Sequence, residues 1–224
     1  MHNGTVLVAA AANTQRKNPS RTCTSKDPGH DDPIPTYNRE TLLTALHNVA
    51  AYINKRGGHV TIVAVGGAVN TIYLQSRATA HDIDFFNEFM TWKESEILLN
   101  GAKNALKHDK SLQKQWFNNR TIFFIPRDKR VMLTQEAFKQ QDVMFSENGL
   151  TMLAAPWKYA FCCKVCRIAG ESIHSARPYD LDDAVQYLYR YQYSLRWTSS
   201  NGTVIAQVNQ KYRLLFKVTY DVIV

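Results

Sequence analysis

The sequence predicts an α+β fold of α/β-like character, in which a small mixed sheet is flanked by helices and followed by a helical C-terminal part. Two patterns lead to this prediction. Short runs rich in β-branched residues lie in the first two thirds of the chain, bounded by glycines or polar turn residues, as buried strands are. Stretches with apolar residues at helical spacing lie between these runs and dominate after residue 156. Early strands with late helices favour an α+β or α/β domain.

The composition is that of an ordinary globular protein, with 224 residues, of which 45% are hydrophobic and 21% charged. No apolar run reaches the roughly 18 residues that a membrane helix needs, so we expect no membrane partner. The net charge of +8 favours ligands that carry phosphates. Three of the four cysteines lie within residues 162–166, which is a poor disulfide framework and favours a reducing, cytoplasmic location.

The first part of the chain differs from the rest. Residues 1–26 contain four Lys or Arg and no acid, and the following stretch is rich in Pro, Gly and Asp. We therefore expect residues 1–34 to form a poorly ordered basic tail. The same composition is found in organellar presequences, which keeps an organellar location open. We expect an α/β domain over 35–155 and a mainly helical part, packed on it, over 156–224.

The best-defined local pattern covers residues 42–86. Apolar residues at helical spacing over 42–53 predict a helix that ends at Gly57-Gly58. A buried strand is expected over 59–65, followed by a glycine turn at 66–67 and a short helix over 68–75. Further strands are expected over 82–86, 121–125 and 141–145, and further helices over 95–115, 134–139, 156–168 and from 179 or 180 to about 191. From residue 194 on, we expect a helix over 204–215 and a final strand.

Two carboxylates in this region suggest metal chemistry. Asp82 and Asp84 are two apart on a predicted strand, so both leave the same face of the sheet. Two hard oxygen donors side by side suit Mg²⁺ or Mn²⁺, which binds through one or two carboxylates together with substrate phosphates. Asp142 begins a later strand, and a neighbouring strand would bring it beside the pair. Such a triad could hold two metals for phosphoryl transfer, with Asp142 as base for the acceptor.

The glycine turn suits the same chemistry, because it could bind the phosphates of a nucleotide whose metal the carboxylates hold. Gly66 and Gly67 follow a predicted strand directly and precede a short helix. Glycines at such a turn let the backbone approach a phosphate closely, and the helix start offers free N–H donors. A triphosphate could therefore lie between the turn and the carboxylates.

The order of these features resembles the signature of the minimal nucleotidyltransferase-fold superfamily, especially the AbiEii/MenT-type toxins and DUF6036-like proteins. The segments that carry the likeness are Gly66-Gly67, Arg77-x-Thr79, His81-Asp82-Ile83-Asp84, the third carboxylate Asp142, Lys164-x-x-Arg167 and Arg177-Pro-Tyr-Asp180-Leu-Asp-Asp183. The likeness covers roughly residues 40–192.

The resemblance implies a toxin-like, Mg²⁺-dependent nucleotidyltransferase that moves an NMP from an NTP to an acceptor hydroxyl on RNA, tRNA or a protein. It implies metal binding by Asp82, Asp84 and Asp142, with Lys164 in the catalytic set. The nucleotide would be bound by Gly66, Gly67, Arg77, Thr79, Lys164, Asp180 and Asp183. The spacing between Arg77 and Asp82 is one residue longer than is most common in that group, which motivates an alternative: a catalytically inactive module that binds nucleotide or RNA.

Simpler explanations exist for some of these residues. Lys164 could be an ordinary solvated side chain, since charged helix positions usually face water. Asp180 and its acidic neighbours could serve as helix caps.

The basic charge is concentrated in one segment. Residues 103–130 carry eight Lys or Arg and two Asp, a net charge of +6. The helical spacing of four of these cations predicts one basic stripe that binds an RNA-like acceptor, formed by Lys103, Lys107, Lys110 and Lys114. Binding of RNA without any nucleotide site is a third possibility, and it depends on charge alone.

Overall fold

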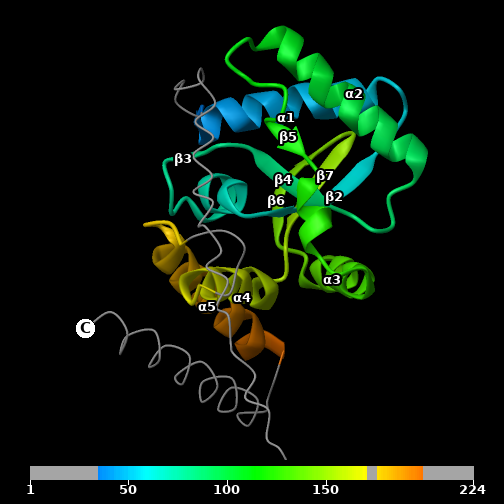
Figure 1. The fold of residues 1–224 in the computed structure, drawn as a ribbon. Helices are drawn as coiled ribbons and strands as arrows, with labels where there is room; N and C mark the ends of the chain where they lie inside the picture. Colours follow the sequence, from blue (N-terminus) through cyan, green and yellow to red (C-terminus); the bar gives the residue numbers. More distant parts are fainter. Residues whose placement is uncertain (1–34, 171–175, 199–224) are drawn as a thin grey trace, which may run out of the picture. The chain divides into compact units, whose positions relative to one another are not determined.

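The structure is a computed structural model, and it describes residues 35–170 and 176–198, all of which belong to the compact unit that begins at Ile34 (Figure 1). The α-helices in these ranges are α1 (Arg39–Asn54), α2 (Trp92–His108), α3 (Arg127–Gln140), α4 (Trp157–Ile168) and α5 (Asp180–Thr198). Two shorter helices are the π-helix η1 (Val69–Leu74) and the 3₁₀ helix η2 (Arg120–Phe124). The strands are β1 (Tyr37–Asn38), β2 (Val60–Val65), β3 (Thr79–Ala80), β4 (Ile83–Phe86), β5 (Phe117–Asn118), β6 (Val143–Glu147) and β7 (Leu150–Ala154).

The main sheet is mixed and has the strand order β5-β4-β2-β7-β6. The central strand β2 pairs antiparallel with β4 and parallel with β7. Towards the edges, β4 pairs parallel with β5, and β6 pairs antiparallel with β7. The short strands β1 and β3 form a separate antiparallel pair. The predicted α+β class, with a small mixed sheet between helices, is therefore confirmed.

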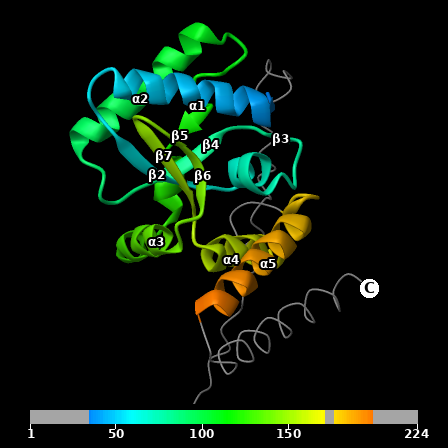
Figure 2. The same cartoon turned by 180° about the vertical axis from the view of Figure 1, so that it is seen from behind.

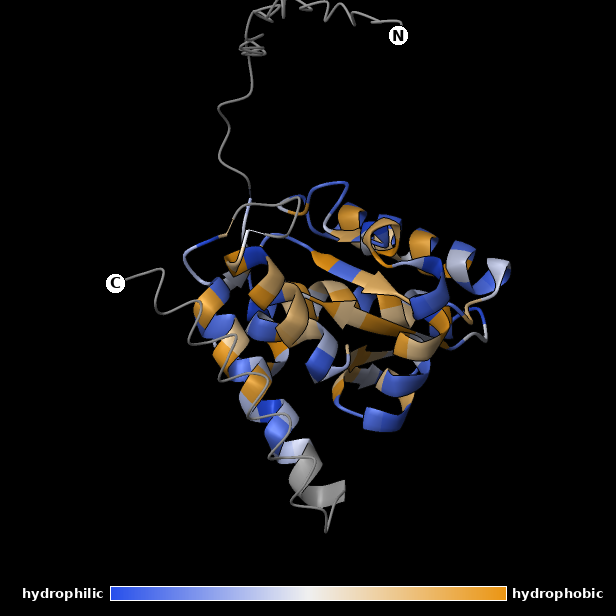
Figure 3. Ribbon diagram, turned by 60° about the horizontal axis from the view of Figure 1, so that its bottom comes forward, coloured by the Kyte–Doolittle hydropathy of each residue, from blue (hydrophilic) through white to orange (hydrophobic). Residues whose placement is uncertain are grey.

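Helices cover both sides of this sheet. Figures 1 and 2 show α1 and α2 along one side, and α3, α4 and α5 along the other. The strand β2 is buried on both faces, and Ile62 and Val63 belong to different clusters of the core. Figure 3 shows that the central strands are largely apolar, whereas the helices alternate apolar and polar stripes. This alternation is expected when each helix buries one face against the sheet.

Local signals explain where the first two long helices begin. The side chain of Asn38 caps α1 by accepting a hydrogen bond from the Thr41 N–H at 2.9 Å. Thr91 and Glu94 form a capping box at the start of α2, in which each side chain bonds the backbone of the other. Within the described ranges, no helix has both the length and the apolar content that a bilayer span requires.

Several predicted elements differ from the structure. The predicted helix 95–115 begins three residues earlier, at the capping box, and ends at His108, where the Asp109 side chain accepts a hydrogen bond from the Ser111 N–H. Lys110 and Lys114 therefore follow the helix, and the predicted four-lysine helical stripe is wrong.

The predicted strand 121–125 is also wrong, because this run forms the 3₁₀ helix η2, which buries none of its residues. The predicted short helix 134–139 is the longer helix α3, and the strand β7 was missed. The predicted tail over 1–34, the helix over 204–215 and the final strand lie outside the described residues.

The turn between β6 and β7 packs directly on α1. Gly149 has a φ of +105°, and a Cβ there would overlap the carbonyl oxygen of Ala50 and lie 2.8 Å from the Asn54 nitrogen. Gly149→Ala should therefore lower the free energy of unfolding by more than about 3 kcal/mol, measured by urea titration. Gly57→Ala is the control, because Gly57 also has a positive φ but has open space around it, so about 1–2 kcal/mol is expected. Equal losses in the two variants would contradict this packing.

Candidate functional site

The two predicted metal-binding carboxylates lie where the central strand ends. Asp84 on β4 is paired with Val65, the residue of β2 that immediately precedes Gly66-Gly67. Ile83 and Phe85 are buried on one face of β4, whereas Asp82 and Asp84 are half-buried and alternate with them. The structure therefore brings the carboxylate pair and the glycine turn together, as the sequence predicts.

The electrostatics of the pair favour a cation. Burial and, to a smaller extent, the negative charge of Asp82 together raise the pKa of Asp84 to about 6. Burial also raises the pKa of Asp82, while a hydrogen bond from Asn118 and the charges of His81, Arg177 and Arg120 lower it. Two like charges that resist ionisation together are stabilised by a bound divalent ion. The chemistry of this pair thus fits Mg²⁺ or Mn²⁺.

The strand next to the pair contributes an amide rather than a carboxylate. Asn118 on β5 is the register partner of Asp84. Its Nδ2 donates to Asp82 Oδ2 at 3.1 Å, and its Oδ1 accepts from the Arg120 N–H at 3.0 Å. Sequence reasoning missed Asn118, and the only available signal was its place directly after the apolar pair 116–117.

Asp142 lies elsewhere, so the expectation that a neighbouring strand brings it beside the pair is wrong. It precedes β6, and the strand order places β2 and β7 between β4 and β6. Three strand spacings amount to about 14 Å. Its Oδ1 accepts from the Tyr73 hydroxyl and its Oδ2 from Trp157 Nε1, each at 2.7 Å. Among the described residues, no group of three or more His, Cys, Asp or Glu could hold a metal.

The glycine turn is held from the C-terminal helices. Gly66 has a φ of +69°, which favours glycine, and its carbonyl oxygen accepts from the Tyr187 hydroxyl at 3.2 Å. Asn70, fully buried in η1, donates to the same hydroxyl at 2.7 Å. A Cβ at Gly67 would lie 3.2 Å from Ala80 Cβ and 3.5 Å from Arg77 Nη1, so the arginine lies against the turn.

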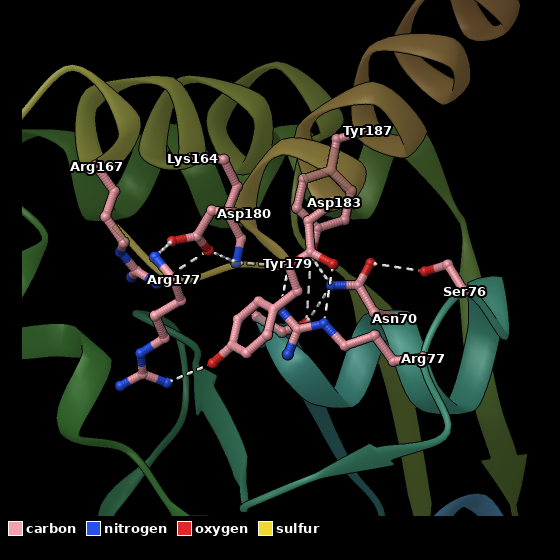
Figure 4. Close-up of polar contacts among 11 residues, drawn as sticks. Asn70, Ser76, Arg77, Lys164, Arg167, Arg177, Tyr179, Asp180, Asp183 and Tyr187 are labelled. Atoms are coloured by element: carbon pink, nitrogen blue, oxygen red, sulfur yellow. Dashed lines mark hydrogen bonds and ion pairs between the residues drawn. The ribbon is translucent and has the colours of Figure 1, made fainter. Parts of the chain in front are cut away.

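A buried ion network joins this turn to α4 and α5 (Figure 4). Lys164 Nζ on α4 lies 2.6 Å from Asp180 Oδ1 and 2.6 Å from Asp183 Oδ2, both on α5. The three side chains are 7%, 0% and 2% exposed, so Lys164 is not a solvated side chain. Arg77 binds both oxygens of Asp183, with its Nε at 2.9 Å from Oδ1 and its Nη2 on Oδ2.

Asp180 has two roles in this network. Its Oδ2 accepts from the Arg177 N–H at 2.9 Å, which fixes the segment just before α5, and its Oδ1 binds Lys164. Burial raises the pKa of Asp180, but the hydrogen bonds from Lys164 and the Arg177 backbone outweigh burial, so its pKa is lowered. Asp180 therefore lies in the acidic first turn of α5, as predicted, but its side chain bonds the segment before the helix and the ion network.

Tyr179 connects the network to the carboxylate pair. The guanidinium carbon of Arg77 lies 3.5 Å from the centre of its ring, and its hydroxyl accepts from Arg177 Nη1 at 2.6 Å. The charge of Arg177 in turn lowers the pKa of Asp82. Among the other predicted nucleotide contacts, Thr79 is exposed on β3.

A model of a sequence family, described as Domain of unknown function (DUF7582), matches residues 36–215. The chain belongs to this family. Neither a curated protein nor a solved structure matches it. The match includes the carboxylate pair, the glycine turn and the Lys164 network, so all three belong to the DUF7582 domain.

The Lys164 network should contribute strongly to stability. Lys164→Met removes the cation that Asp180 and Asp183 share and leaves each of these buried carboxylates with one arginine, Arg167 or Arg77. We therefore expect a loss of about 3 kcal/mol in the free energy of unfolding, measured by denaturant titration at pH 7. Lys158→Met is the matched control, because Lys158 is exposed on the same helix. Equal stability of the two variants would show that the network is not formed.

The raised pKa of Asp84 predicts a dependence of stability on pH. The folded protein holds this proton up to about pH 6, whereas an unfolded chain releases it near pH 3.8. The contribution of Asp84 to the free energy of unfolding should therefore fall as the pH rises from 4 to 6, in the absence of divalent ions.

Asp84→Asn removes this penalty and should be more stable than the wild type at pH 7 by about 1–2 kcal/mol, after allowance for solvent screening. The difference should vanish near pH 4, measured by thermal unfolding across the pH range. Glu96→Gln, at an exposed position on α2, is the control and should follow the wild type. A parallel pH profile for Asp84→Asn would contradict the assigned environment.

Proposed function

We propose that this protein is a Mg²⁺- or Mn²⁺-dependent nucleotidyltransferase that moves an NMP from an NTP to an acceptor hydroxyl. The observation that carries the proposal is the position of Asp82 and Asp84. Asp84 pairs with Val65 of β2, and the glycine turn begins at the next residue, Gly66. A site with two oxygen donors beside a closely approachable backbone suits a metal-bound triphosphate. The acceptor is an RNA, such as a tRNA, or a protein.

The residues of the site would have three functions: binding the metal, allowing close approach of the triphosphate and neutralising its charge. Asp82 and Asp84 would hold the metal, which neutralises phosphate charge and polarises the reacting phosphorus. Gly66 and Gly67 allow the triphosphate to approach the backbone. Arg77 lies against Gly67, and its guanidinium is oriented by Asp183, so it offers a fixed cation to the phosphates.

The residues of the ion network act through Arg77 in this proposal. Lys164 is enclosed by Asp180 and Asp183, so it positions the network and does not contact the nucleotide. Asp142 anchors Tyr73 and Trp157 beside β6, which β2 and β7 separate from the carboxylate pair, so in this proposal it takes no part in the reaction. The acceptor oxygen would form its bond to the α-phosphorus of the NTP as the bond to pyrophosphate breaks. The acceptor proton would pass to solvent or to the departing pyrophosphate, because Asp142 is not placed to accept it.

A specific observation favours the inactive alternative as a second candidate. The strand beside the carboxylate pair supplies the amide of Asn118 where a third carboxylate was expected. A site with two carboxylates could bind a metal and a nucleotide and still not transfer the NMP. This alternative predicts NTP binding without a labelled product.

We place the activity in the cytoplasm. Cys162 and Cys163 are free thiols on α4, which is usual in a reducing compartment. The basic composition of residues 1–26 keeps an organelle as the alternative.

The proposal is tested by incubating the protein with α-labelled NTPs, Mg²⁺ and total RNA or protein. We expect an acceptor to become labelled, and Asp82→Asn/Asp84→Asn to reduce the rate at least about 100-fold, because the metal is lost. Asp128→Asn/Glu136→Gln is the matched control, since it also removes two carboxylates but at exposed positions on α3.

Label that persists in the Asp82→Asn/Asp84→Asn variant would refute the proposed mechanism. Calorimetric titration with each NTP separates the two candidates. Binding without transfer supports the inactive module, and failure of every NTP to bind contradicts both.

A further inference from the structure

The short helix η2 begins at the carboxylate pair. Asn118 bonds Asp82 with its amide nitrogen and the backbone of Arg120 with its oxygen. The charge of Arg120 lowers the pKa of both Asp82 and Asp84. The first residue of η2 is thus held next to the two carboxylates.

This helix exposes two large aromatic side chains. Phe123 is 79% exposed and Phe124 is 58% exposed, and η2 buries none of its residues. In a 3₁₀ helix the side chains at positions i and i+3 eclipse one another, so Arg120 and Phe123 lie along one edge. The edge that begins at the carboxylate pair therefore carries a cation and then an exposed ring.

The cations that follow are of two kinds. Arg130 donates to the carbonyl oxygens of Ile122 at 2.8 Å and Ile125 at 3.1 Å, so it stabilises the end of η2. Arg127, at the start of α3, is exposed like Arg120. We call Arg120, Phe123, Phe124 and Arg127 the η2 surface.

Two exposed rings with an arginine on either side match one class of ligand better than others. Single-stranded nucleic acids are bound by stacking of their unpaired bases on aromatic side chains and by contacts of their phosphates with cations. A duplex offers no free base face to Phe123, and a basic or neutral protein does not complement the charge. The lysines of α2 lie on the helix layer across the sheet, because Leu98 and Ala105 of α2 pack in the core with Phe85, on the face of β4 opposite Asp84.

We propose that the η2 surface binds a single-stranded nucleic acid, with a base stacked on Phe123 and phosphates on Arg120 and Arg127, and that it directs the strand end to Asp82 and Asp84. The second half of this proposal depends on the proposed function, because it makes the strand the acceptor. The first half is a binding property and is tested without nucleotide or metal.

The binding test uses fluorescence anisotropy of the full chain with a 12-nucleotide RNA, a DNA strand of the same sequence and a duplex RNA. We expect both single strands to bind and the duplex to bind more weakly. A preference for RNA over DNA would show that the 2′-hydroxyl contributes, and equal affinity would show that bases and phosphates suffice; both support the proposal. Duplex binding as tight as single-strand binding would overturn it.

The contribution of stacking is tested with one aromatic variant and two controls. Phe123→Ala should weaken single-strand binding at least about fivefold with an unchanged salt dependence, and Phe123→Tyr should restore it. Trp92→Ala removes an 85% exposed aromatic side chain at the start of α2, outside the η2 surface, and should bind like the wild type. Wild-type affinity of Phe123→Ala would overturn the proposal, as would binding of an acidic peptide at the η2 surface in place of the strands.

The contribution of charge is tested by two matched double variants. Arg120→Ala/Arg127→Ala should make the negative slope of log affinity against log salt concentration shallower by about 1.4, since each phosphate contact with a single strand contributes about 0.7. Lys103→Ala/Lys107→Ala removes two exposed cations from α2 and should leave the slope nearly unchanged. The reverse result would place the strand on the predicted lysine stripe and would overturn the proposal.

Failure of this proposal can be distinguished from failure of the proposed function. If the wild type binds the strand but no NTP, the binding surface is supported and the transferase is contradicted. If the wild type transfers label to an acceptor but Phe123→Ala does so with unchanged KM for the strand, the η2 surface is overturned and the transferase is supported.

Discussion

Lys164 is a cation removed from water, and the two carboxylates that neutralise it lie one turn apart on α5. Burying a charge is costly unless it is paired and fully hydrogen-bonded, so α4 and α5 can pack only in the register that brings these groups together. Asp183 also binds Arg77, and Arg77 lies against Gly67. The packing of the C-terminal helices thereby determines where the glycine turn and its arginine lie.

The charges of Asp82 and Asp84, unlike that of Lys164, are not neutralised by close partners of opposite sign. Lys164 has more negative partners than its own charge requires, whereas Asp82 and Asp84 repel one another and have an amide and more distant cations as their neighbours. A protein that stabilises one group of charges and leaves a neighbouring pair destabilised is typical of a binding site, because the unfavourable energy of the pair is recovered when a cation binds. Hydrogen bonds from Tyr187 and Asn70 to the carbonyl oxygen of Gly66 support the turn beside the pair.

The parts of this account that the sequence predicts are local. The helix α1, the strand β2 and the alternation around Asp84 follow from periodicity, and the start of α4 follows from Pro156. Asp142 and Asn118 could not be placed, because their positions depend on which strands become neighbours in the sheet. The run 121–125 is β-branched and aromatic, but the hydrogen bond from Arg120 to Asn118 turns the chain into a 3₁₀ helix. The environment of Lys164 depends equally on tertiary packing.

The central claim is that the carboxylate pair and the glycine turn form one metal and nucleotide site. Its most direct test is a crystal structure of the protein with Mn²⁺ and a non-hydrolysable NTP, with the metal located by anomalous scattering. The account predicts an anomalous peak in contact with both Asp82 and Asp84, and a triphosphate against Gly66 and Gly67 within reach of Arg77. Nucleotide and metal bound at a different place, or an anomalous map without a peak at the pair in saturating Mn²⁺, would contradict it.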